Sequence, residues 1–244
     1  HGRMRRRWFE RESDPEAARR IAAELKIPAI VARLLTQRGV ATPEAARAFL
    51  HPSTESFHDP ALLLGMPEAL ARLRQAIAAK EKILIYGDYD VDGTTSVVLL
   101  CKAIELAGGQ ADFHVPHRVR EGYGMREDVI ERAAADDVKL LISVDTGIRE
   151  IEVVEKAAAL GIDSIITDHH IPEDRIPPAL AVLNPNQPNC PYPDKNLCGV
   201  GIAFKLAQAL LATLGWPDEK LRRVAESMLM IVAIGTIADL VPLA

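Results

Sequence analysis

Short apolar runs alternate with amphipathic helical segments from about residue 67 onward, and this alternation constrains the fold more than any other feature of the sequence. The apolar runs are nearly continuous in Val, Ile and Leu, as in residues 138–144, which is typical of strands buried on both faces. Such strands, separated by helices, predict an α/β fold with a largely parallel sheet and helices on both of its faces.

The expected elements follow from the hydrophobic period and from the Gly and Pro residues that bound it. We expect strands at 82–86, 111–115, 138–144 and 162–167, with one more at 181–183. We expect helices at 67–80, 94–107, 126–135, 148–160, 199–214 and 218–234, and a loop rich in Pro and Asn over 184–198.

The chain before this region has a different character. Asp14-Pro15 and Thr42-Pro43 each place a capping residue before a proline, which predicts small helices between residues 14 and 50. We therefore expect a small helical N-terminal arm over residues 1–60 and one main domain over 61–244. The arginines of the arm form either a solvated face or a contact surface for phosphates. They are Arg5, Arg6, Arg7, Arg11, Arg19 and Arg20.

Composition excludes intrinsic disorder, because 48% of the 244 residues are hydrophobic and 26% are charged. The longest uncharged apolar run, Met228–Ala238, is too short to span a bilayer, so we expect no membrane partner. No signal segment opens the chain and its three cysteines form no C-x-x-C pair, so we expect a cytoplasmic protein without a disulfide framework. A net charge of −5 does not suggest a general nucleic-acid binder and does not exclude one.

Acidic and imidazole side chains follow three of the predicted strands, at the points where the strands end. Ligands bind beyond the carboxyl ends of the strands in open parallel sheets, and right-handed crossovers put these ends on one edge. We therefore expect five carboxylates and two imidazoles to converge. They are Asp88, Asp90 and Asp92 after strand 82–86, Asp145 after strand 138–144, and Asp168, His169 and His170 after strand 162–167.

Such a cluster predicts a metal site, because like charges this close disfavour ionisation unless a cation relieves them. Carboxylates suit Mg²⁺ or Mn²⁺, and added imidazole favours Mn²⁺. So many ligands suggest two ions about 3.5–4 Å apart, with Asp145, the only acid at its strand end, as the bridge. In an extended turn Asp90 and Asp92 would point the same way, and Gly87 and Gly93 would allow the turn.

Nearby motifs narrow the chemistry. Neither the G-x-x-x-x-G-K-[ST] phosphate loop nor a G-x-G-x-x-G after a strand is present, which disfavours nucleoside triphosphatases and dinucleotide-binding enzymes. After strand 111–115, Arg118 beside His117 either binds a phosphate in a bidentate manner or lies in a solvated turn. Tyr123 either stacks on a base or packs on its own loop. Taken alone, Asp239 could be a loop residue with no role.

Four segments resemble, in order, the motifs of the DHH phosphoesterases. They are Gly87–Gly93 (GDYDVDG), Val144-Asp145, Asp168-His169-His170 and Gly235–Pro242 (GTIADLVP). Further segments are similar to the RecJ-like branch of that family, whose members are single-strand-specific 5′→3′ DNA exonucleases. These segments are Pro116-His117-Arg118, Glu121–Gly124, Asn184–Asn186 and Gly199–Phe204. The resemblance covers roughly residues 30–244.

The resemblance implies that residues 61–244 form a DHH-type metal-dependent phosphoesterase domain. It would hydrolyse single-stranded DNA from the 5′ end, as in DNA repair and recombination, with two Mn²⁺ or Mg²⁺ ions. The implied metal ligands are Asp90, Asp92, Asp145, His169 and Asp239, with Asp88 as a further one. Together with His170, the first five form the implied catalytic set. The implied substrate-binding residues are His170, Arg118, His117 and Tyr123, and Asp168 and Gly93 would support the ligands from close by.

Two alternatives stay open within the same fold. One is a small-molecule phosphoesterase, such as a pyrophosphatase or a nanoRNA or cyclic-dinucleotide phosphodiesterase. The other is a non-catalytic replication-fork scaffold. The chain departs from some relatives at Tyr86, where they carry a His, so we expect one metal ion to keep water there. RecJ-like proteins continue into a second domain and an OB-fold, and we expect this chain to be truncated and to lack both.

Overall fold

The computed structural model describes residue 9 and residues 11–243. Within this range the chain divides into two compact units, one ending at Phe57 and one beginning at His58, close to the expected boundary after residue 60. The first unit contains α1 (Pro15–Leu25), α2 (Ala29–Thr36), α3 (Pro43–Leu50) and the short 3-10 helix η1 (Thr54–Ser56). Arg5, Arg6 and Arg7 of the predicted basic arm lie outside the described residues.

The helices of the first unit begin where the sequence predicts. The Asp14 carboxylate accepts the backbone N–H groups of Glu16 and Ala17 at 2.9 and 3.0 Å, and the Thr42 hydroxyl accepts that of Ala45 at 3.2 Å. Both residues therefore satisfy amides that the first turn of a helix leaves free. The buried core of this unit combines three alanines with two larger aliphatic side chains, namely Ala18, Ala32, Ala46, Ile21 and Leu35.

The second unit is built on a five-stranded sheet in which every pair of neighbouring strands is parallel. The strands are β1 (Lys82–Gly87), β2 (Ala111–His114), β3 (Val138–Val144), β4 (Asp163–Thr167) and β5 (Ala181–Leu183). Each lies within one residue of its predicted bounds. The sheet order is β2-β1-β3-β4-β5, so the direction of winding reverses between β1 and β3. At such a reversal the carboxyl ends of the two strands leave a crevice where ligands bind.

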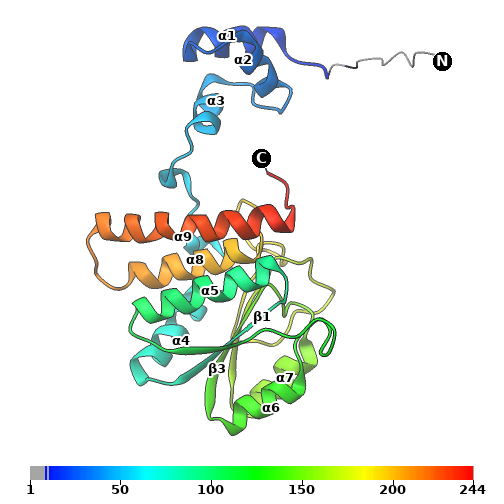
Figure 1. The fold of residues 1–244 in the computed structure, drawn as a ribbon, viewed down its shortest axis with the longest axis vertical. Helices are drawn as coiled ribbons and strands as arrows, with labels where there is room; N and C mark the ends of the chain where they lie inside the picture. The colour runs from blue at the N-terminus through cyan, green and yellow to red at the C-terminus, as the bar shows by residue number, and fades with distance from the viewer. Residues whose placement is uncertain (1–8, 10, 244) are drawn as a thin grey trace, which may run out of the picture. The chain divides into compact units, whose positions relative to one another are not determined.

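Helices cover both faces of the sheet, which confirms the predicted α/β class (Figure 1). Successive side chains of a strand point to opposite faces, and in β1 Ile83 and Ile85 join one buried core while Leu84 and Tyr86 join the other. The first core packs under η2 (Pro60–Leu62), α4 (Met66–Ala79), α5 (Val91–Leu106) and α8 (Gly199–Ala212). The second packs under α6 (Glu127–Ala135) and α7 (Ile151–Ala159).

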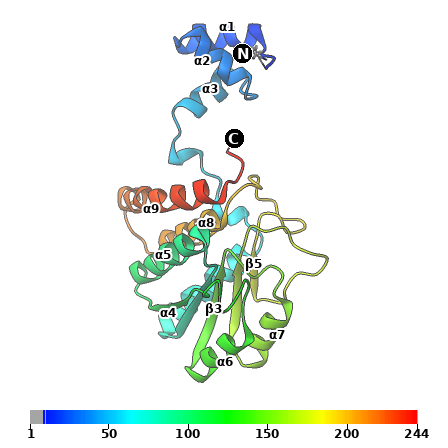
Figure 2. The ribbon, with the colours of Figure 1, turned by 45° about the vertical axis from the view of Figure 1, so that its right-hand side comes forward.

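The last helix, α9 (Asp218–Asp239), forms an outer layer on α5 and α8 (Figures 1 and 2). It runs past the predicted end at residue 234, because Gly235 does not break it. Gly235 is buried, and a Cβ there would lie 2.6 Å from a side-chain carbon of Val200 and 2.7 Å from the Thr95 hydroxyl. The missing side chain thus lets α9 approach its neighbours, and Asp239 is the last helical residue, not a loop residue.

The start of α5 also differs from the prediction. The helix begins at Val91 and not at residue 94, because Asp90 caps it by accepting the N–H of Gly93 at 2.9 Å. Asp92 therefore lies in the first helical turn, and the expected extended Asp90-Val91-Asp92 turn is wrong. Among the helices that the structure describes, none has both the length and the hydropathy to cross a bilayer.

Arg72 ties α4 to the amino-terminal ends of the strands. Its side chain is 9% exposed. The Nε atom donates to Asp163 at 2.7 Å, Nη1 lies 2.7 Å from the Glu81 carboxylate, and Nη2 donates to the backbone carbonyl of Lys139 at 3.3 Å. One guanidinium thus holds α4, β3 and β4 together.

We predict that Arg72→Ala lowers the free energy of unfolding by about 2 kcal/mol, because it leaves two carboxylates without their cation. Urea unfolding measures the change. Arg74→Ala, at an exposed position of the same helix, is the control and should change stability by less than about 0.5 kcal/mol. Equal effects of the two variants would contradict the role given to Arg72.

Candidate metal centre

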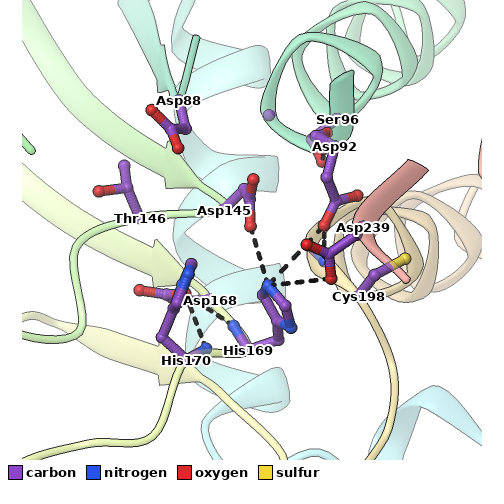
Figure 3. A network of polar contacts seen from close by, with 12 residues as sticks. Asp88, Asp92, Ser96, Asp145, Thr146, Asp168, His169, His170, Cys198 and Asp239 are labelled. Carbon is purple, nitrogen blue, oxygen red and sulfur yellow. Dashed lines mark hydrogen bonds and ion pairs between the residues drawn. The ribbon is translucent and has the colours of Figure 1, made fainter. Parts of the chain in front are cut away.

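The clustered side chains lie at the carboxyl ends of β1, β3 and β4 and at the end of α9 (Figure 3). Asp88 follows β1, Asp145 follows β3, and His169 and His170 follow β4, while Asp239 reaches the group from α9. Because β1 and β3 flank the reversal of the sheet, the cluster occupies the crevice that the topology opens.

Asp145 lies at the middle of the cluster and is 1% exposed. Its backbone is left-handed, with φ of 60°, a conformation that Asp adopts more readily than most residues. The backbone N–H still continues the sheet by donating to the carbonyl of Thr167 at 2.9 Å. The first residue of α8, Gly199, packs against the side chain so closely that a Cβ would lie 2.6 Å from Oδ1. The carboxylate is therefore fixed in place and removed from solvent.

Asp92 is held by the start of α8. Its two carboxylate oxygens accept the N–H groups of Gly199 at 2.5 Å and Val200 at 2.8 Å, where the positive end of the helix dipole favours an anion. A Cβ on Gly235 would lie 2.9 Å from Asp92 Oδ1, so α9 also packs against this residue. Three helices thus meet at one buried carboxylate.

Asp88 and Asp90 complete the acidic side of the cluster. Asp88 is buried and accepts the N–H of Tyr89 at 2.7 Å, whereas Asp90 is exposed. Gly93 allows the loop between them to fold back, because a Cβ there would lie 2.5 Å from the Asp88 carbonyl oxygen. Only a residue without a side chain fits this approach.

His169 faces three carboxylates through one atom. Its Nε2 lies 3.2 Å from Asp145 Oδ1, 3.7 Å from Asp239 Oδ2 and 3.9 Å from Asp92 Oδ2 (Figure 3). Asp145 Oδ1 and His169 Nε2 are both buried and neither has a hydrogen-bond partner in the described chain. Two buried polar atoms without partners are costly in an apoprotein, and a cation between them would satisfy both.

Three overlapping groups of side chains could each hold a metal ion, and the possible ligand atoms of each group lie within 4.8 Å of one another. Asp145 belongs to two groups and His169 to two. The groups are Asp145, His169 and His170; Asp92, His169 and Asp239; and Asp88, Asp90 and Asp145. Oxygen ligands with one or two imidazoles fit Mn²⁺ or Mg²⁺ better than softer metals.

The clustered acids also carry the electrostatic signature of such a site. Burial, followed by the charges of Asp92, Asp90 and Asp168, raises the pKa of Asp145 to about 10. Burial likewise raises the pKa of Asp92 and of Asp88. Without a cation, burial and the neighbouring charges therefore disfavour the charged form of these carboxyls.

Asp168 behaves differently because its carboxylate is fully used by the protein. It accepts the N–H groups of Ile148, His169 and His170 at 2.9, 2.7 and 3.1 Å, and it lies 2.7 Å from His170 Nδ1. Burial acts to raise the pKa of Asp168, but the hydrogen bond from His170 and the backbone amides outweigh it and lower the pKa. The same bond raises the pKa of His170. Asp168 thus orients the His170 imidazole and holds the backbone of both histidines, and it belongs to none of the possible ligand groups of the described residues.

Besides His170, the predicted substrate-binding residues lie in the segment between β2 and α6. Tyr123 is 58% exposed, and its ring centroid lies 6.3 Å from that of His170 and 6.3 Å from that of Tyr89. The Arg118 guanidinium carbon, Cζ, lies 5.3 Å from the centroid of the Tyr89 ring. Tyr123 therefore faces the cluster and not only its own loop. The His117 ring instead accepts the N–H of Val119 at 3.3 Å within its own turn.

Sequence reasoning missed several residues that shape the site. The Asn184 and Asn186 side chains donate to the backbone carbonyls of His170 and His169 at 2.9 and 2.8 Å. The sequence singles out these residues only as part of the family resemblance, which gives them no role. The role of Tyr89 under Arg118 and beside Tyr123 had no signal in its spacing.

Comparison with known proteins gives a match to one family model and to several relatives that are longer than this chain. The model of the DHH family, N-terminal domain, matches residues 82–236. The chain is 45% identical over 237 residues to the single-stranded-DNA-specific exonuclease RecJ of Bacillus subtilis, which covers 97% of this chain and 29% of that protein. It is 38% identical to the Escherichia coli exonuclease of the same name, over 98% of this chain and 41% of that one.

Solved structures agree with these matches. A crystal structure of Thermus thermophilus RecJ in complex with Mn²⁺ superposes with a TM-score of 0.76 and 27% identity, over 95% of this chain and 32% of that one. A crystal structure of exonuclease RecJ bound to manganese gives a TM-score of 0.66 and 33% identity, over 74% and 44%. The chain thus spans less than half the length of these relatives.

We predict that the metal-free chain loses stability as the pH rises. The pKa of Asp145 is higher in the folded state than the ~3.9 of an unfolded Asp, so the folded state binds the extra proton and stability falls above about pH 4. The slope reaches up to about 1.4 kcal/mol per pH unit. Asp145→Asn, which cannot ionise, should flatten this slope between about pH 5 and 8 and should stabilise the metal-free chain at pH 8. Urea denaturation in the presence of a chelator, repeated at several pH values, measures the slope. The same dependence of unfolding free energy on pH in both proteins would contradict the raised pKa of Asp145.

Proposed function

The chain belongs to the DHH family, and from this premise we propose that residues 61–244 form a metal-dependent phosphoesterase domain that hydrolyses phosphodiester bonds in single-stranded DNA. The proposed activity is a 5′→3′ exonuclease of the repair and recombination type. The relatives described as single-stranded-DNA-specific exonucleases, at up to 45% identity, support the choice of substrate. The direction of digestion rests on the family resemblance.

One observation carries the proposal: Asp145 Oδ1 and His169 Nε2 are buried, 3.2 Å apart, and without hydrogen-bond partners in the described chain. A fold that needed no cation would pair these atoms with the protein, as it pairs Asp168 and Asp92. The donors kept at every family position except Tyr86 also argue against a non-catalytic scaffold, which would have no need to keep them.

The proposed ions are Mn²⁺ or Mg²⁺, two in number, in keeping with the Mn²⁺- and Mg²⁺-bound structures of relatives. Asp145 is the proposed bridge, because it is the only carboxylate that belongs to two of the possible ligand groups found among the described residues. The other proposed ligands are Asp88, Asp90, Asp92, His169 and Asp239. Bound divalent ions supply Lewis acidity and allow a hydroxide nucleophile at neutral pH.

His170 is the proposed proton-bearing group of the site. Its Nδ1 is engaged by Asp168 at 2.7 Å, so Nε2 is the atom free to contact substrate. Because the hydrogen bond to Asp168 raises the pKa of His170, the ring keeps a proton on Nε2 at higher pH than an ordinary histidine. A protonated Nε2 can donate to a phosphate oxygen and stabilise the charge that develops there.

Arg118 and Tyr123 are the proposed contacts to the nucleic acid away from the reacting phosphorus. Arg118 is exposed, can bind a phosphate through two N–H groups, and is stacked on Tyr89. Tyr123 presents an exposed ring beside His170 on which a base can stack. His117, whose ring is used within its turn, shapes that turn in this proposal.

Properties of the whole protein are part of the proposal, since the curated relatives are longer than this chain. We propose that the full-length protein adds a second domain and an OB-fold that hold longer strands. We also propose a cytoplasmic location, which is consistent with a DNA substrate. The small-molecule phosphoesterase activity is the alternative outcome of the tests below.

We predict that Mn²⁺ raises the melting temperature of the chain by about 5–10 °C at a free concentration near 100 times Kd, because binding to the folded state alone adds about 2.7 kcal/mol. Chelator should reverse the shift. Asp145→Ala should lose most of it, whereas Asp174→Ala, at an exposed position, should keep it. A wild-type melting temperature that does not change when Mn²⁺ is added would refute the metal site.

We predict Mn²⁺-dependent digestion of 5′-labelled single-stranded oligonucleotides, with double-stranded DNA and pyrophosphate left intact. Asp145→Ala should reduce the rate by at least about 10³-fold with the fold retained, because it removes the proposed bridge. Asp174→Ala is the control with unchanged rate. Cleavage of pyrophosphate but not DNA would favour the small-molecule alternative, and full activity of Asp145→Ala would refute the bridge.

A further inference from the structure

Tyr86 occupies a position where some members of the family carry a histidine, yet it does not face the acidic cluster. Its ring belongs to the buried core under α6 and α7 and is 0% exposed. Its hydroxyl donates to the backbone carbonyl of Gly124 at 3.2 Å, and it belongs to none of the possible metal-ligand groups found among the described residues.

Glu150, at the start of α7, contacts the same turn from another side. Gly124 has φ of 90°, and a Cβ there would overlap the Glu150 carboxylate, so this carboxylate lies directly against the Gly124 backbone. Burial raises the pKa of Glu150, and a hydrogen bond from the backbone N–H of Met125 to the carboxylate opposes this rise. Gly124 and Met125 are both buried.

The two contacts concern one peptide unit, because the carbonyl of Gly124 and the N–H of Met125 belong to the same peptide bond. In a trans peptide these groups point in opposite directions. Tyr86 therefore holds one side of the peptide plane and Glu150 the other, and together they fix the rotation of the plane. We call this arrangement the peptide clamp.

The clamp lies next to Tyr123, the residue proposed to stack on a base of the substrate. Tyr123 precedes the clamped peptide, and its exposed ring meets His170 and Tyr89 at centroid distances of 6.3 Å each. Gly122 and Gly124, on either side of it, both have positive φ, so the turn has little stiffness of its own. Without an external hold, the ring would sample many positions.

We propose that Tyr86 and Glu150 are positioning residues that clamp the Gly124–Met125 peptide and so hold the Tyr123 ring in place beside His170 to stack on a base of the substrate. The inference deepens the proposed function and rests on it for the substrate. It gives Tyr86 a role that does not involve a metal ion. Phenylalanine would fill the same space but could not hold the carbonyl.

Hydrogen exchange tests the clamp without any substrate. Tyr86→Phe and Glu150→Ala should speed exchange over residues 122–126 by about fivefold, which corresponds to the loss of one hydrogen bond. The controls are Tyr192→Phe, which removes a hydroxyl buried in the other core, and Glu152→Ala, at an exposed position of α7. Both controls should leave this segment unchanged. Unchanged exchange in Tyr86→Phe and Glu150→Ala would overturn the clamp.

Steady-state kinetics tests its effect on the substrate. With a 5′-phosphorylated single-stranded oligonucleotide and Mn²⁺, Tyr86→Phe should raise KM about threefold with kcat unchanged, and Tyr123→Ala should raise it about tenfold. The double variant should match Tyr123→Ala alone. On an oligonucleotide with abasic nucleotides at its 5′ end, Tyr86→Phe should behave as wild type.

The two proposals fail in different ways. If wild type does not cut the oligonucleotide, the proposed function fails, while hydrogen exchange still decides whether the clamp exists. If wild type cuts it but the two substitutions act additively, or the abasic substrate shows the same rise in KM, Tyr86 does not act through Tyr123 and the inference is overturned. The Mn²⁺-induced rise in melting temperature should persist in Tyr86→Phe, because the clamp lies outside the metal centre.

Discussion

A buried carboxylate that the protein itself does not satisfy is the constraint on which the rest of this structure depends. Asp145 is 1% exposed, has other acids around it, and directs Oδ1 toward His169 with no hydrogen-bond partner in the described chain. The neighbouring acids show that the fold is able to pair such groups: Asp92 is satisfied by the amides of α8, and Asp168 by backbone N–H groups and His170. Within the cluster, Asp145 Oδ1 and His169 Nε2 therefore stay unpaired at the place where a cation would act.

The helical layer on one face of the sheet is as much a part of the site as the strand ends. Gly199 allows α8 to press on Asp145, and Gly235 allows α9 to press on α5 and Asp92. Because α9 packs this closely, its last residue, Asp239, comes within 3.7 Å of His169. Packing of small residues on helices thus sets the distances between charged groups at the sheet edge, and a side chain at either glycine would separate them.

The sequence predicts the sheet and the carboxyl ends of its strands well, because the hydrophobic pattern of a strand and the residue at which it ends are local properties. Asp145 and His169 lie at the strand ends where the pattern puts them. The position of Asp239 depends on how far α9 extends. The sequence does not reveal this length, because a glycine inside an apolar segment can either end a helix or lie within it. The start of α5 was misjudged because Asp90 acts as a cap, and nothing in the spacing distinguishes a cap from a turn. The contact of Tyr86 with the turn between β2 and α6 depends on tertiary packing alone.

The central claim is that two divalent ions share Asp145. Electron paramagnetic resonance of the chain loaded with Mn²⁺ tests it most directly, since two ions joined by one carboxylate are spin-coupled whereas separate ions are not. The account predicts a coupled pair in wild type that is lost in Asp145→Ala and kept in Asp174→Ala. Only uncoupled Mn²⁺ in the wild type, or a coupled pair that survives Asp145→Ala, would contradict it.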